Sequence, residues 1–245
     1  MEYTKLNNPP IAVALFQLRY ETDNFDFNQF DSRIRKYLPN RHENINVGID
    51  FNKTNFPIGE SPVLGKANAK IGSHLYYSKN QKTKIEISSS SFTYICEEQY
   101  EGWDNFKSEI LKYLKIIEPE LSNSKVSRIS LRFINKFMFK EFDDPSKYFN
   151  ILVTSVSDKN FYPLEQYGFR MIMNIPDSDI ISIVNHNVEN ITDGNYIYIF
   201  DIDVIDRQNI FYDIQTIEST INNLRDVKDK IFFDTITSET IELCN

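Results

Sequence analysis

Four basic residues recur along one stretch of the sequence at a spacing that suits anion binding. Residues 127–140 read SRISLRFINKFMFK, and the cations fall at even positions: Arg128, Arg132, Lys136 and Lys140. Side chains two residues apart share one face of a β-strand, so all four would stand on the same side. Guanidinium and ammonium groups bind phosphates and carboxylates through charge-assisted hydrogen bonds. We expect these four residues, called the basic face below, to meet an anionic ligand or an acidic partner.

The same strand carries large apolar residues on its other side, interrupted by Asn135. Such a strand belongs to a sheet that covers a core on one side and meets solvent or a ligand on the other. A buried amide needs hydrogen-bond partners, so Asn135 either holds a neighbouring loop backbone or reaches a ligand. Arg19, on the equivalent strand of the first half, would join the basic face. The alternative is a solvated face whose cations are neutralised by Glu21 or other acids.

Asp201 and Asp203 form a second candidate site within the segment NYIYIFDIDVI at 195–205. They project to the same side of a predicted strand, and two carboxylates at that spacing can hold a divalent cation. A metal site needs further oxygen or imidazole ligands, and no nearby motif supplies them. Arginine or lysine partners on the adjacent strand explain the pair equally well. We therefore expect neither a metal nor a cofactor.

The composition excludes several classes of function. The chain has 245 residues, 41% of them hydrophobic, which is ample for a packed core. Its 7 glycines argue against phosphate-cradling loops, and its formal net charge of −8 disfavours nucleic acid and anionic membranes as partners. The 2 cysteines, Cys96 and Cys244, make no disulfide framework and no metal-ligand spacing, so we expect unpaired thiols.

The first residues, MEYTKLNNPP, show no basic segment followed by an apolar one. The longest apolar run, residues 11–16, is far shorter than the ~20 residues that a membrane helix needs. We expect a cytoplasmic protein that does not enter a membrane.

Apolar periodicity predicts a strand and a helix, then more strands and a long helix, in the first half of the chain. Pro39 and Asn40 end the first helix, and a turn near residues 88–91 must separate two strands of opposite apolar phase. Trp103 should anchor the second helix on the sheet. The predicted elements are strand 11–21, helix 26–38, a weak strand near 45–51, strands 74–78, 83–88 and 91–97, and helix 103–121.

The second half repeats this order: strand 127–140, a helix over 145–153, strands 166–175, 179–187 and 195–205, and helix 211–232. We predict one domain built from two repeat halves, 1–122 and 123–245, on the order of elements alone. The expected fold class is α+β: two similar units that share a curved antiparallel sheet with helices packed on one face. The other face of the sheet, called the open face below, would be available for binding.

Five segments carry a resemblance: NNPPIAVALFQLRYE at 7–21, EQYEGWDNF at 98–106, VSRISLRFINKF at 126–137, YIYIFDIDV at 196–204 and IFFDTITSETIE at 231–242. They resemble, in the same order, a sporadically distributed and uncharacterised bacterial family of proteins of about 250 residues. The resemblance implies a bacterial accessory protein, passed between hosts by horizontal transfer. It implies no chemistry and assigns no catalytic residue.

We expect a non-catalytic binding or sensor module of a multi-gene bacterial system such as phage defence. It would recognise a protein partner encoded nearby, or a small anionic ligand, on the open face through Arg19, Arg128, Arg132, Asn135 and Lys136. One alternative is a metal-dependent enzyme that acts on a phosphorylated substrate through Asp201 and Asp203. That enzyme needs the acidic pair and the basic face in one cleft. A second alternative, nucleic-acid binding on the basic face, is disfavoured by the net charge.

Overall fold

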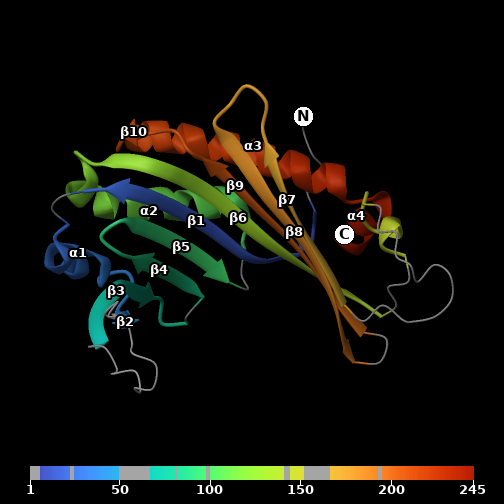
Figure 1. Ribbon diagram of the computed structural model, residues 1–245, viewed down its shortest axis with the longest axis horizontal. Helices are drawn as coiled ribbons and strands as arrows, with labels where there is room; N and C mark the ends of the chain where they lie inside the picture. Colours follow the sequence, from blue (N-terminus) through green and yellow to red (C-terminus); the bar gives the residue numbers. More distant parts are fainter. Residues whose placement is uncertain are drawn as a thin grey trace, which may run out of the picture.

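Strands from both halves of the chain join in one antiparallel sheet (Figure 1). The computed structural model describes residues 6–22, 25–49, 67–80, 82–97, 100–140, 144–151, 166–192 and 195–245. Within these residues the sheet has 10 strands, in the order β2-β3-β4-β5-β1-β6-β9-β8-β7, with β10 paired to β6. The strands are β1 (Ile11–Glu21), β2 (Asn40–Ile49), β3 (Ala67–Tyr77), β4 (Thr83–Ile87), β5 (Ser91–Glu97), β6 (Lys125–Phe139), β7 (Gln166–Asn174), β8 (Ile180–Thr192), β9 (Asn195–Asp206) and β10 (Ile210–Phe211).

The helices lie on one face of this sheet, so the predicted α+β class is confirmed. They are α1 (Phe27–Ile34), α2 (Trp103–Leu121), α3 (Ile214–Thr235) and α4 (Ser238–Leu243), with a 3₁₀ turn, η1 (Pro145–Lys147). In Figure 1 the two long helices, α2 and α3, run behind the central strands. No helix among the described residues is long and apolar enough to cross a membrane.

Alternation along the central strands builds the core. On β1, the side chains of Ala14, Phe16 and Leu18 are fully buried and face the helices, while the intervening residues face the other side. Phe16 lies opposite Tyr94 of β5 and Leu131 of β6, so three strands present large side chains to the helices at one level. Each such buried side chain contributes roughly 1.5–3 kcal/mol through removal of apolar surface from water.

The strands of the two halves are arranged in the same order from the centre of the sheet to its edges. β1 and β6 pair at the centre; β5, β4 and β3 follow β1 outward, and β9, β8 and β7 follow β6. This is the arrangement expected of two similar units that meet along their first strands. The origin of the two halves by duplication stays a prediction.

Most predicted elements are present, with shifts at their ends. β1, β5 and α2 have the predicted bounds, and the predicted turn before β5 is confirmed by the hydrogen bond from Ser88 N to Ser91 O, 2.8 Å. The weak strand near 45–51 is β2, which begins earlier; residues 50 and 51 lie outside the described residues. α3 begins later than predicted because Phe211 belongs to β10 and Asp213 caps the helix.

The predicted helix over 145–153 is wrong where the structure describes it; residues 152 and 153 lie outside the described residues. η1 ends after one turn, and Phe149 then forms a β-bridge with Ile236, at the end of α3. Phe149 is fully buried and stacks on Tyr198 of β9 at 3.9 Å between ring centroids. Tertiary packing of one aromatic residue thus overrides the local helical pattern.

Candidate functional site

The basic face lies on the open face of the sheet, but its central arginine is already paired. Arg132 donates from Nε and Nη2 to the two carboxylate oxygens of Asp201 on β9, both at 2.8 Å. The side chain of Asp201 is only 6% exposed and also accepts a hydrogen bond from Asn185 Nδ2 at 2.9 Å. Such a two-pronged arginine–carboxylate pair satisfies both groups within the protein.

The neighbouring cation, Arg128, makes a single contact with the other carboxylate. Arg128 Nη2 lies 3.3 Å from Asp203 Oδ2. Burial raises the pKa of Asp203, while Arg128 and Arg132 oppose that rise. Arg19 stands opposite Arg128 in the register of β1 and β6, as the sequence suggested, and donates to Gln17 Oε1 at 3.3 Å. Arg19 and Lys136 are exposed.

Asp201 and Asp203 therefore lie on the same side of the sheet as the basic residues, as the metal-enzyme alternative required. Their carboxylates, however, form ion pairs with Arg132 and Arg128. Among the described residues, no group of three or more histidine, cysteine, aspartate or glutamate side chains could hold a metal ion. Cys244 is a free thiol, as predicted, and no disulfide joins it to Cys96.

Asn135 stands on the opposite, helix-covered side of the sheet from the rest of the predicted set. It is 2% exposed, and its Nδ2 donates to the backbone oxygens of Phe200 at 2.9 Å and Phe133 at 3.5 Å. Asn135 thus holds strand backbone, not a loop. Both hydrogen bonds use Nδ2, which leaves Oδ1 as the acceptor that faces away from these strand carbonyls. The five residues predicted as one site are divided between the two faces.

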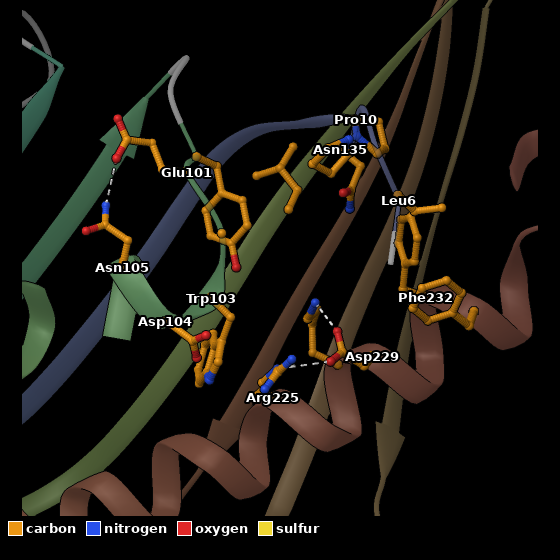
Figure 2. Close-up of a pocket in the computed structure, with 16 residues that line it drawn as sticks. Leu6, Pro10, Glu101, Trp103, Asp104, Asn105, Asn135, Arg225, Asp229 and Phe232 are labelled. Carbon is orange, nitrogen blue, oxygen red and sulfur yellow. Dashed lines mark hydrogen bonds and ion pairs between the residues drawn. The ribbon is translucent and has the colours of Figure 1, made fainter. Parts of the chain in front are cut away.

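A cavity of about 430 Å³ lies on the helix side, over Asn135 (Figure 2). We call it the α2–α3 pocket because the first turn of α2 and one face of α3 form two of its walls; the chain leading into β1 forms the third. Figure 2 shows Asn135 and Pro10 on one side, Trp103 and Asp104 on a second, and Arg225 and Asp229 on a third. The remaining lining residues are Leu6, Pro9, Ile11, Tyr100, Glu101, Gly102, Asn105, Lys228, Phe232 and Phe233.

The α3 wall carries three charged side chains within one turn. Lys228 contacts Asp229, and Arg225 Nε lies 3.2 Å from Asp229 Oδ2. The Lys228 side chain is 11% exposed, and its Nζ lies 4.5 Å from the centre of the Phe133 ring, a cation–π contact. Burial lowers the pKa of the Lys228 ammonium, and Asp229 opposes that shift. One carboxylate is shared by two cations, so this wall is net positive.

The α2 wall is a helix start without a side-chain cap. Gly102 occupies the capping position with a φ of 106°, and within the part of the chain that the structure describes no side chain caps the first-turn N–H groups. The first N–H groups of a helix have no partner within it and carry partial positive charge, so they favour an anion. Trp103 follows at once, with the Arg225 guanidinium 5.0 Å from the centre of its ring. The expected anchoring of α2 by Trp103 is consistent with its packing against the core.

Acidic groups stand at the rim. Glu101 and Asp104 are exposed, and Glu101 Oε2 accepts a hydrogen bond from Asn105 Nδ2 at 3.2 Å. Tyr100 lies deeper, with its ring edge-on to Phe133 at 5.7 Å; burial raises the pKa of its hydroxyl, and Asp229 adds to that rise. The hydroxyl is therefore a neutral donor at physiological pH.

The charged residues of this pocket were not predicted from the sequence, although one signal was present. Ile217, Ile221, Leu224 and Phe232 are the buried residues of α3, and Lys228 lies about one helical turn from both Leu224 and Phe232. A lysine in an apolar stripe breaks the pattern that the surrounding residues set.

Comparison of the sequence with models of protein families found no match, and comparison with curated proteins found no match either.

Proposed function

We propose that this protein is a binding module for a small anionic molecule, and that the molecule occupies the α2–α3 pocket. The observation that carries the proposal is the buried cation Lys228 at the wall of a cavity of about 430 Å³. A volume of this size is within the range of small-molecule sites, roughly 300–1,000 Å³. Charged groups are rarely buried without a functional or pairing reason, and this one is paired with a carboxylate that Arg225 also neutralises.

The pocket offers each part of an anion-binding site. Arg225 can present its planar donors to a carboxylate or phosphate, and the uncapped start of α2 adds backbone N–H donors. The Oδ1 of Asn135 can accept a hydrogen bond from a hydroxyl of the ligand, and Trp103 and Phe232 supply apolar surface. The basic face is a weaker candidate, because Arg128 and Arg132 already bind carboxylates of the protein itself.

The test uses a favourable property of the chain: Trp103 is its sole tryptophan. Fluorescence of the wild-type protein is titrated with succinate, lactate, inorganic phosphate and a sugar phosphate, and thermal unfolding is followed in parallel. We expect at least one of these anions to change the emission and raise the melting temperature, because a ligand of the native state stabilises it.

Two matched variants place the site. Arg225→Met should abolish the response, and Lys136→Met, which removes the same charge from the open face, should leave it intact. The reverse result would return the site to the basic face, and no response of the wild-type protein to any of the four anions would contradict the proposal.

A second candidate function is recognition of a protein partner on the open face. Met138 and Ile172 stand on that face and are 69% and 63% exposed, and Met138 lies two residues from the exposed Lys136 on β6. Aromatic and apolar side chains that stay exposed beside cations are common at interfaces. The resemblance to a sporadic bacterial family adds the proposal that such a partner is encoded nearby, as in defence systems. Met138→Glu should then abolish co-purification of neighbouring gene products from the native host, while Lys112→Glu on α2 should not.

A further inference from the structure

Lys228 occupies a position where packing alone calls for an apolar side chain. It continues the buried stripe of Ile217, Ile221 and Leu224, and its Nζ lies against the Phe133 ring at the pocket wall. Replacement of a buried ion pair by well-packed apolar residues is often neutral or stabilising. A role of the Lys228 amine in the pocket therefore explains this residue better than a contribution to the stability of the core.

We propose that Lys228 is a nucleophilic amine that forms an imine with a small 2-oxo acid bound in the α2–α3 pocket. This inference rests on the proposed function, because it names the class of anion. A 2-oxo acid joins a carboxylate to a carbonyl, and the pocket has a group for each. Arg225, one turn before Lys228 on α3, is placed to bind the carboxylate while the amine faces the carbonyl.

The groups around the amine can carry the protons of the reaction. Asp229 contacts Lys228 directly, and Tyr100, a neutral hydroxyl, lines the same pocket and packs edge-on against Phe133. Burial lowers the pKa of Lys228, which increases the fraction of neutral amine at a given pH. The charged groups that act on the amine are Asp229 and Arg225 from α3, and Glu101 and Asp104 line the same pocket at the α2 rim.

The reaction balances without an oxidant or a reductant. The ammonium gives one proton to Asp229, and the Nζ lone pair forms a bond to the carbonyl carbon. The carbonyl electron pair moves to oxygen, which takes a second proton from the nitrogen to give a carbinolamine. The hydroxyl then leaves as water with the proton returned by Asp229, and the product is a protonated C=N bond to Lys228.

Reductive trapping tests the inference on the intact protein. Pyruvate and sodium cyanoborohydride are added at neutral pH, and the modified lysines are mapped by peptide mass spectrometry. We expect Lys228 to be modified several-fold faster than exposed lysines such as Lys136, because Arg225 would hold the carboxylate of pyruvate beside the Lys228 amine in the pocket. Equal modification of Lys228 and the exposed lysines would overturn the inference.

Lys228→Arg keeps the charge but cannot form the imine, so it should lose the adduct. Should that variant fail to fold, the comparison of lysines within the wild-type protein still decides.

Lactate separates this inference from the proposed function, because it has the same carboxylate and no carbonyl. Lactate should change Trp103 fluorescence and slow the trapping of pyruvate at Lys228. Binding of lactate and pyruvate without any adduct at Lys228 would refute the imine and leave the anion site in place. An adduct at Lys228 that lactate does not slow would refute the shared binding site.

Discussion

At the scale of single residues, the arginines of the open face are structural groups that hold strands together. Arg132 uses its whole guanidinium edge on Asp201, and Asp201 is almost fully buried. Removal of one partner leaves the other as a buried charge without a counter-ion. This lowers the free energy of unfolding by more than the intact pair contributes to it.

Arg132→Met should therefore lower the free energy of unfolding by about 1–3 kcal/mol. Asn185 still donates to Asp201 in this variant, which limits the loss. Denaturation in urea measures the effect, and Lys136→Met on the same strand, whose side chain is exposed, should change stability by no more than about 0.5 kcal/mol. Equal stabilities of the two variants would mean that the Arg132–Asp201 pair contributes nothing to the fold.

At the scale of elements, the residue that precedes α2 must adopt a positive φ, and the same residue lines the proposed site. Gly102 has a φ of 106°, a conformation that residues with a Cβ rarely adopt, although no atom lies within 4 Å of where that Cβ would stand. The cost of a larger residue there is conformational and not steric.

Gly102→Ala should destabilise the protein by about 1–2 kcal/mol and weaken anion binding, because it strains the backbone that presents the first N–H groups of α2. Urea denaturation and the Trp103 titration measure the two effects. Ser108→Ala, in the exposed part of the same helix, should change neither. Full stability of the Gly102 variant would show that the turn adopts another conformation.

The elements themselves were largely predictable, since period-two and period-3.6 patterns follow from burial on one face. Phe16 and Leu18 on β1, or Ile110 and Leu114 on α2, carry that pattern without interruption. The site was less predictable, because it depends on which strands become neighbours. The register of β6 and β9 sets Arg132 opposite Asp203, which brings Arg132 within reach of Asp201, and the sequence alone does not show this register. Likewise, only the packing of α3 on β6 brings Lys228 to Phe133.

At the scale of the whole molecule, one buried histidine couples the stability of the fold to pH. His186 of β8 is fully buried between the rings of Phe169 and Phe200, at 4.5 and 4.7 Å, and its Nδ1 lies 2.6 Å from the Tyr198 hydroxyl. Burial lowers the pKa of His186 to about 4. The unfolded chain, in which the pKa is about 6.5, binds a proton first as pH falls.

The stabilising contribution of His186 is therefore complete above pH ~6.5 and is lost as pH falls from ~6.5 toward ~4. We expect the stability difference between the wild-type protein and His186→Gln to shrink over this range, by up to about 3 kcal/mol. Urea denaturation at several pH values measures it, with His42→Gln at an exposed position as the control. A difference that stays constant with pH would contradict the burial of a neutral imidazole.

The α2–α3 pocket should attract anions, and quenching of Trp103 by small ions measures this attraction most directly. Iodide and caesium ions both quench tryptophan but carry opposite charges, so their relative quenching constants report the local potential. We predict stronger quenching by iodide than by caesium in the wild-type protein, and loss of that preference in Arg225→Met but not in Lys136→Met. Equal or stronger quenching by caesium in the wild-type protein would mean that Glu101 and Asp104 dominate the pocket, and it would contradict the account.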